Sequence, residues 1–224
     1  MFYKKGVIKF GKGIIRNEKT AASPIPEREY IRFKYKLEEL SGDNKERNMM
    51  LFYIGVATGY RMQDIVNLTI GELKEAVESG EFRIQEQKQY KSYIKHIKKN
   101  PKSKRKPPKK RVVLIKPMLK KILRKYVTNK KKSEYAFKSN KGDGYITAKS
   151  YSKILTNVAK ELNIDNISGH SLRKTYITRI WDATGDLELC RRALGHKSIE
   201  TTKEYLGLAL EVREEAANIA DSKL

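Results

Sequence analysis

The chain of 224 residues has one cysteine, Cys190, and three histidines. One cysteine cannot form an internal disulfide, and these residues lack the spacing of a zinc site. We therefore expect no metal and no cofactor. No apolar stretch approaches the roughly 18 residues of a membrane-spanning helix, and the N-terminus has no hydrophobic signal-peptide core. The protein is expected to be cytoplasmic and to have no membrane partner.

Acidic residues are scarce relative to basic ones. The sequence has 49 lysines and arginines against 26 aspartates and glutamates, a formal net charge of +23. This excess is larger than solubility requires and indicates a polyanionic partner. Nucleic acid is the leading candidate, and an anionic membrane surface is the alternative. A chain of this length can bury one sizeable core, so we expect one main domain.

Segments with strand character are few. Residues 1–23 are rich in glycine and lysine and lack periodicity, which predicts a flexible arm or linker end before a domain at 24–224. The segments 82–86 and 112–115 predict an antiparallel hairpin. Helical periodicity dominates elsewhere, so the expected fold class is mainly α with a small antiparallel β-sheet (α+β). The predicted helices cover residues 26–40, 44–58, 63–68, 70–79, 118–127, 147–162, 172–181, 187–194, 199–206 and a C-terminal helix within 208–224.

One segment between the predicted strands concentrates the positive charge. Residues 88–111 contain ten lysines, two arginines, three prolines and no acidic residue. This composition predicts an extended basic hairpin loop, which is either a solvated disordered tract or a clamp on the DNA backbone. The two interpretations are compatible, because a mobile basic loop can order when it binds phosphates. The residues expected to bind DNA are Lys91, Lys95, Lys98, Lys99, Lys102, Lys104, Arg105, Lys109 and Lys110.

Two arginines and a histidine suggest a phosphate site. Arg61 directly follows a helix that we expect to be buried and is therefore held rigidly. His170 and Arg173 are three residues apart at a predicted helix start, where their side chains share a face and the helix dipole attracts an anion. Arginine forks match the oxygens of a phosphate. The alternative is an N-capping Ser171 followed by an ordinary surface arginine.

Tyr205 is the candidate nucleophile. It lies on a predicted helix, nine residues after His196. A phenol has a pKa of about 10, so it needs a positive environment and a proton acceptor before it can attack. His170 is the candidate acceptor. Most of the thirteen tyrosines must be packing or surface residues, and the hypothesis depends on the short segment that ties Tyr205 to the histidines and Arg173.

These segments resemble the catalytic boxes of tyrosine recombinases, the family of phage integrases and the Xer and Cre enzymes. The similar segments are TGYRMQD at 58–64, HSLRKT at 170–175 and LGHKS at 194–198, followed by Thr201, Thr202 and Tyr205. The resemblance covers roughly residues 24–224 and implies the tyrosine recombinase catalytic-domain fold.

The resemblance implies a role for each residue of the pattern. Arg61 and Arg173 would bind the scissile phosphate, and His170 would act in proton transfer. His196 would hydrogen-bond a phosphate oxygen. Tyr205 would form a 3′-phosphotyrosyl link to DNA.

The resemblance also implies a lysine on the hairpin that protonates the leaving 5′ oxygen. We assign this general acid to Lys88, with Lys91 and Lys109 as alternatives. Asp64, three residues after Arg61, matches the acidic position of the family, and we expect it to brace that arginine.

The implied function is site-specific recombination of double-stranded DNA by cleavage and rejoining, without metal or nucleotide, by a tetramer on paired DNA sites. The segment 209–220 would pack on a neighbouring subunit or, alternatively, on its own subunit. Residues 1–23 are too few for the core-binding domain of the family, which we expect to be absent. The chain would then be a catalytic fragment, a minimal recombinase or a protein that borrows a partner's clamp. The alternative functions are a type IB topoisomerase and a non-catalytic DNA-binding regulator.

Overall fold

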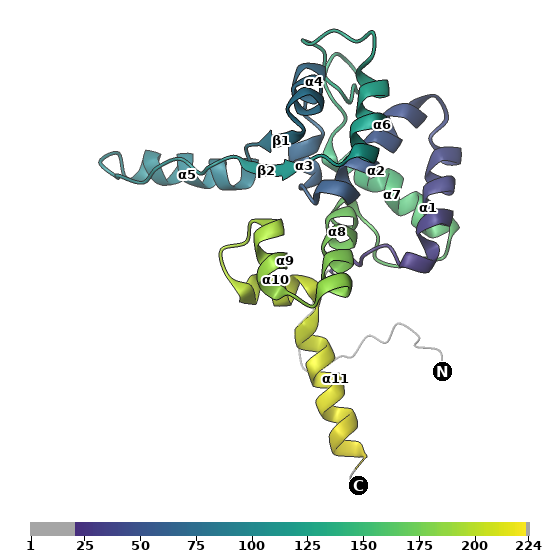
Figure 1. Ribbon diagram of the computed structural model, residues 1–224, viewed down its shortest axis with the longest axis vertical. Coiled ribbons are helices and arrows are strands. Elements are labelled where there is room, and N and C mark those ends of the chain that lie inside the picture. Colours follow the sequence, from purple (N-terminus) through teal and green to yellow (C-terminus); the bar gives the residue numbers. More distant parts are fainter. Residues whose placement is uncertain (1–20, 223–224) are drawn as a thin grey trace, which may run out of the picture.

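The computed structural model describes residues 21–222, apart from the side chains of 209–215, so most of the expected arm at 1–23 lies outside the described residues. Helices form most of this part of the chain, and two short strands pair beside them (Figure 1). The elements in chain order are α1 (Glu27–Leu40), the 3-10 turn η1 (Gly42–Asn44), α2 (Lys45–Thr58), α3 (Met62–Ile65), α4 (Ile70–Ser79), β1 (Glu81–Ile84), α5 (Gln87–Lys99), β2 (Arg111–Leu114), α6 (Pro117–Val127), α7 (Ala148–Glu161), α8 (Gly169–Thr184), α9 (Leu187–Leu194), α10 (Ile199–Leu206) and α11 (Leu208–Asp221). The expected fold class, mainly α with a small antiparallel sheet, is confirmed.

Helix α2 is the centre of the main core. Its apolar residues surround the helix instead of forming one stripe, which predicts burial on all sides. Leu51, Phe52 and Ile54 are fully buried, and the helix packs against α1, α6 and α8. The end of α2 is therefore held rigidly by the core, and Arg61 lies three residues after it.

The hairpin expected from the sequence is present. Strands β1 and β2 pair antiparallel, with Phe82 opposite Val113 and Ile84 opposite Arg111. Phe82 and Ile84 are buried against the core. The hydroxyl of Tyr60 donates to the carbonyl oxygens of Phe82 (3.3 Å) and Arg111 (2.6 Å), so the residue before Arg61 is tied to both strands.

The connection between the strands corrects our expectation of an extended loop across 88–111. Its first half is helix α5, and only residues 100–110 are irregular. Tyr90, Tyr93, Ile94 and Ile97 recur at helical spacing, and lysines cover the opposite face, which is a helical pattern that the charge count obscured. Helix α5 projects away from the body in Figure 1 and has no buried residue.

The helices that follow carry the second half of the candidate site. The N-cap of α8 is Ser168, whose hydroxyl forms a capping box with Ser171, so Ser171 is not the cap. Ser198 caps α10 through the amide of Thr201, as the sequence indicated. A small second core of Ile177, Cys190 and Leu194 joins α8 to α9, and Tyr205 of α10 packs against it. Tyr205 is thereby fixed to the helix that carries His170 and Arg173.

The C-terminal segment forms helix α11, as predicted. Figure 1 shows α11 extending away from the body, and its main neighbour is α10. Residues 216–222 are exposed, including Ile219, whose exposed fraction is 59%.

Candidate active site

Arg173 is anchored where two helix ends meet. It lies in the second turn of α8, with a side chain only 2% exposed. One guanidinium nitrogen donates to the carbonyl of Gly59 at the end of α2, and the other donates to Leu194 at the end of α9 (2.7 Å). Gly59 has a φ of 59°, and a Cβ there would lie 2.2 Å from the ring of Tyr176. Only glycine fits this turn, which brings Arg61 next to Arg173.

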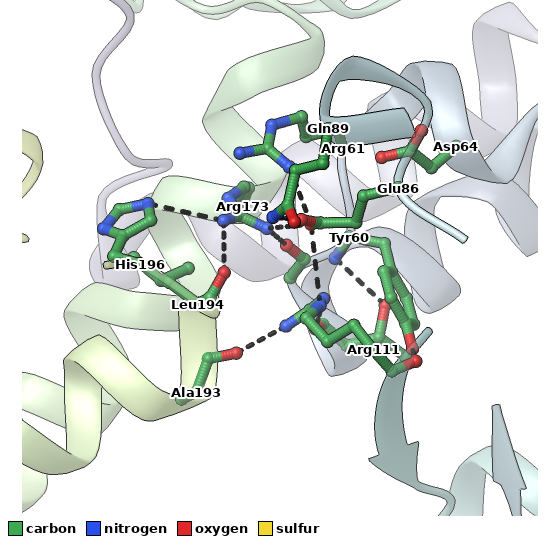
Figure 2. Close-up of polar contacts among 12 residues, drawn as sticks. Tyr60, Arg61, Asp64, Glu86, Gln89, Arg111, Arg173, Ala193, Leu194 and His196 are labelled. Carbon is green, nitrogen blue, oxygen red and sulfur yellow. Dashed lines mark hydrogen bonds and ion pairs between the residues drawn. The ribbon is translucent and has the colours of Figure 1, made fainter. Parts of the chain in front are cut away.

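A buried carboxylate lies between the arginines (Figure 2). Glu86 follows β1, and its side chain is 4% exposed. Its Oε1 lies 2.6 Å from Nη1 of Arg61, 3.7 Å from Nη1 of Arg173 and 3.7 Å from Nε of Arg111. Neither Glu86 nor Arg111 belongs to a motif that the sequence displays. The available signal was position, because Glu86 is the last acidic residue before the basic segment 88–111.

Arg111 joins the hairpin to the rest of the site. Its guanidinium group donates to the carbonyl of Thr58 (2.8 Å) and to that of Ala193. It also stacks on the ring of Tyr60, 3.9 Å from the ring centroid. One side chain of β2 therefore contacts the ends of α2 and α9, which flank Arg61 and His196.

The carboxylate that forms an ion pair with Arg61 is Glu86, while Asp64, which we expect to brace this arginine, interacts with it through the charge of Arg61. Asp64 is buried, and its Oδ1 accepts the amide N–H of Gln87 (2.9 Å). Burial raises the pKa of Asp64, and the Gln87 amide opposes this rise. Asp64 thus fixes the first residue of α5, directly before Lys88.

A cleft of about 610 Å³ opens beside Arg61. Lys88 and Lys91 of α5 and His170 of α8 line it, whereas Lys109 is not among its lining residues. His170 is exposed in the cleft. Partial desolvation of its ring by the surrounding protein lowers the pKa of His170, and the charges of Arg61, Arg173 and Lys88 lower it further. A neutral imidazole at pH 7 can accept a proton.

Tyr205 lies beside His196. Their rings meet edge to face, with centroids 5.6 Å apart. His196 Nδ1 contacts the buried hydroxyl of Thr202 (3.1 Å), and Nε2 lies 3.5 Å from Arg173. Burial, followed by the charge of Arg173, lowers the pKa of His196 to about 4. These contacts fix the ring of His196 between Arg173 and the helix that carries Tyr205.

The hydroxyl of Tyr205 is buried and has no aligned hydrogen-bond partner within the described part of the chain. Burial raises the pKa of Tyr205, while the charges of Arg173 and Arg61 oppose the rise. Tyr205 is in contact with His196, whereas His170 lines the cleft beside Arg61. The cationic surroundings favour a phenolate or a bound phosphate.

The nine residues expected to bind DNA are all exposed. Four of them, Lys91, Lys95, Lys98 and Lys99, lie on α5, and the others lie in the irregular segment 100–110. Among the described residues, no group of three or more His, Cys, Asp or Glu side chains is placed to hold a metal ion. None of the helices described by the structure is both long and apolar enough to cross a membrane.

The sequence model of the phage integrase family matches residues 27–211, which is most of the chain. The chain belongs to the phage integrase family. Site-specific DNA recombination is the function that the family model and the curated relatives support.

Curated relatives of this integrase-family chain are integrases and recombinases. It is 26% identical over 181 residues to the probable integrase/recombinase YoeC of Bacillus subtilis (strain 168), an alignment that covers 80% of this chain and 88% of YoeC. It is 28% identical over 187 residues to the tyrosine recombinase XerD of Rickettsia conorii (strain ATCC VR-613 / Malish 7). That alignment covers 77% of this chain but 56% of XerD, so the chain spans about half the length of that relative.

Solved structures share the fold of this integrase-family chain. The XerH site-specific recombinase bound to its difH substrate superposes with a TM-score of 0.60 and 23% identity, covering 89% of this chain and 53% of XerH. The catalytic domain of bacteriophage HP1 integrase gives a TM-score of 0.52 and 19% identity, covering 88% of this chain and 94% of that domain. The match to an isolated catalytic domain agrees with the expected tyrosine recombinase catalytic-domain fold.

Proposed function

We propose that this chain cleaves and rejoins double-stranded DNA, with Tyr205 as the nucleophile. The observation that carries the proposal is the meeting of Arg61, Arg173, His196 and Tyr205 at one place in a single chain. Two guanidinium groups can neutralise the non-bridging oxygens of one phosphate as charge develops there. The side chain of Arg61, 24% exposed, is the more accessible of the two and faces the cleft.

In the proposed reaction, the hydroxyl oxygen of Tyr205 bonds to the scissile phosphorus, and the bond from phosphorus to the 5′ oxygen breaks. The tyrosine proton passes to His170, which is neutral at pH 7, and Lys88 supplies a proton to the leaving 5′ oxygen. The product is a 3′-phosphotyrosyl link and a free 5′-hydroxyl. Because the link retains the energy of the phosphodiester, a 5′-hydroxyl of a partner strand can reverse the step.

The proposed DNA surface begins in the cleft and continues along α5. Lys88, Lys91, Lys95 and Lys98 are spaced by three, four and three residues, which places them on one face of the helix. The first two of them line the cleft. Thirteen residues of helix span about 20 Å, which is enough to follow several phosphates of one strand. The remaining basic residues of 100–110 extend this surface.

The assembly that we propose is a tetramer on paired DNA sites in the cytoplasm. The support for DNA as partner is the net charge of +23, together with the fold shared with XerH, whose structure holds its difH substrate. The support for a subunit contact is α11, which extends beyond the body with exposed residues at 216–222.

Covalent trapping tests the proposal. The wild-type chain is mixed with a library of nicked duplexes of randomised sequence, and adducts that survive denaturation are sequenced to identify the preferred site. On that site, Tyr205→Phe should give no adduct. Tyr35→Phe is the matched control, because Tyr35 is an exposed residue of α1, and it should match wild type. Adducts formed by Tyr205→Phe at the wild-type yield would show that another residue is the nucleophile.

The same assay separates the candidate general acids. A duplex with sulfur in place of the bridging 5′ oxygen has a leaving group that needs no proton. Lys88→Ala should cleave the oxygen substrate slowly and the sulfur substrate at the wild-type rate. Lys91→Ala should keep the wild-type ratio of the two rates. If Lys91→Ala instead cleaves the oxygen substrate slowly and the sulfur substrate at the wild-type rate, the general acid is Lys91.

A further inference from the structure

One carboxylate oxygen faces three arginines in the interior of the site. Oε1 of Glu86 lies within 3.7 Å of a guanidinium nitrogen from each of Arg61, Arg111 and Arg173. None of these contacts is an aligned hydrogen bond, since Oε1 of Glu86 and Nη1 of Arg61 lack one within the described residues. Backbone carbonyls hold Arg111 and Arg173 in place, whereas the guanidinium group of Arg61 has no hydrogen bond among the described residues and is held near Glu86 by charge.

The arginines need a counter-ion before any phosphate arrives. Three cations and one carboxylate leave this buried cluster with a net charge of +2, and like charges in a desolvated site repel one another. Burial and the charges of Arg61 and Arg111 lower the pKa of Arg173 to about 10, and the charge of Glu86 opposes this shift. Without Glu86, repulsion would drive the most exposed member, Arg61, away from Arg173.

Glu86 also belongs to the segment that carries the candidate general acid. Its carbonyl oxygen accepts the amide of Tyr90 (3.1 Å), which starts the hydrogen bonding of α5. Its Oε2 accepts the side-chain amide of Gln89 (2.6 Å). Lys88 lies between these residues in the first turn. A single residue thus contacts the phosphate-binding arginines and the base of α5.

We propose that Glu86 is a positioning residue for the cleavage reaction. Its carboxylate holds Arg61 beside the anchored Arg173 and relates this pair to Lys88 at the base of α5. This inference rests on the proposed function, in which these arginines bind the scissile phosphate. Glu86 does not itself contact the substrate, because its side chain is 4% exposed and lies beneath Arg61.

The substitution Glu86→Gln separates charge from shape. Glutamine keeps the size and an acceptor oxygen but removes the negative charge, so the cluster changes from +2 to +3. An anion should then bind more tightly, while Arg61 loses its fixed position beside Arg173. Binding and chemistry are therefore expected to change in opposite directions, whereas a general loss of folding would weaken both.

The experiment compares the full chain carrying Glu86→Gln with wild type and with Glu81→Gln, a control in which the carboxylate pairs with Arg83 of the same strand. Melting temperatures are measured in sodium sulfate and in sodium chloride of equal ionic strength. Sulfate should raise the melting temperature of Glu86→Gln more than that of wild type or of Glu81→Gln. At saturating DNA, adduct formation by Glu86→Gln should be slower by about 100-fold, the typical cost of a misplaced reacting group.

An equal sulfate response in all three proteins, or a wild-type rate of adduct formation in Glu86→Gln, would overturn the inference. The sulfate arm needs no DNA cleavage, so it tests Glu86 even if wild type forms no adduct and the proposed function fails. If Glu86→Gln does not fold, Gln89→Ala takes its place. It removes only the hydrogen bond to Oε2, and it should slow adduct formation several-fold with an unchanged sulfate response. A wild-type rate in Gln89→Ala would then count against the positioning role.

Discussion

Replacing Arg111 by lysine tests whether one side chain holds the hairpin to the helices around the site. The substitution keeps the positive charge but removes the fork. A lysine can donate to the carbonyl of Thr58 or to that of Ala193, but its single nitrogen cannot match both in the positions that they occupy now. It also removes the guanidinium group that stacks on Tyr60.

The expected cost follows from these contacts. A hydrogen bond from a charged donor contributes about 1.5 to 3 kcal/mol, and stacking of a guanidinium group on an aromatic ring contributes about 0.5 to 1 kcal/mol. Arg111→Lys should therefore lower the free energy of unfolding by about 2 to 4 kcal/mol. For a chain of this size, the melting temperature should fall by about 4 to 16 °C. The protein should remain folded, because this loss is smaller than the usual 5 to 15 kcal/mol of total stability, in round numbers.

Urea denaturation followed by circular dichroism measures this change. Arg83→Lys is the matched control, since Arg83 is an exposed arginine of β1 whose partner is Glu81 of the same strand, and its stability should stay within about 0.5 kcal/mol of wild type. Arg111→Lys should also slow adduct formation, because Thr58 and Ala193 flank Arg61 and His196. A loss of less than about 0.5 kcal/mol would show that the three contacts do not stabilise the fold, and it would refute the reasoning.

Two further predictions concern pH and salt. The pKa of His196 is lowered to about 4 in the folded protein, so unfolded chains bind an extra proton between about pH 6.5 and pH 4. The free energy of unfolding of wild type should therefore fall by about 1 to 3 kcal/mol more than that of His196→Asn as pH drops through this window, and parallel curves would contradict the assignment. Replacing Lys91, Lys95, Lys98 and Lys99 by glutamine should reduce the slope of log affinity against log salt by up to about 4, because each lost phosphate contact contributes about 0.9. The same change at Lys34 and Lys36 of α1, on the opposite side of the body in Figure 1, should leave the slope unaltered, and equal slopes in both variants would remove α5 from the DNA surface.

Local patterns predicted most of the fold. Helices α9 and α10 begin and end at the residues expected, because Gly195 and Ser198 end one helix and cap the next through their own backbone and side-chain chemistry. The alternation and clustering of apolar residues was enough to identify the hairpin. Composition hides helix α5, because twelve basic residues in 24 indicate a solvated loop even though Tyr90, Ile94 and Ile97 recur at helical spacing.

The candidate site was predicted only where a motif marked it. Arg61, Arg173, His196 and Tyr205 belong to short boxes, and the structure brings them together. Glu86 belongs to no box, and its function depends on arginines 25 residues before it and 25 and 87 residues after it. Such contacts are set by the packing of α2, α8 and the hairpin, and no periodicity within one element reports them.

Helix α5 has no buried residue, so the sequence that would contact DNA along it and the stability of the fold do not constrain each other. A substitution on this helix removes no packing from either core, so its sequence can change with little effect on folding. The same helix begins at Gln87, next to the buried carboxylates of Asp64 and Glu86, which are part of the geometry of the site. Recognition along the rest of α5 can therefore diverge, or be exchanged by grafting another helix after Lys91, while the chemistry at its base stays the same.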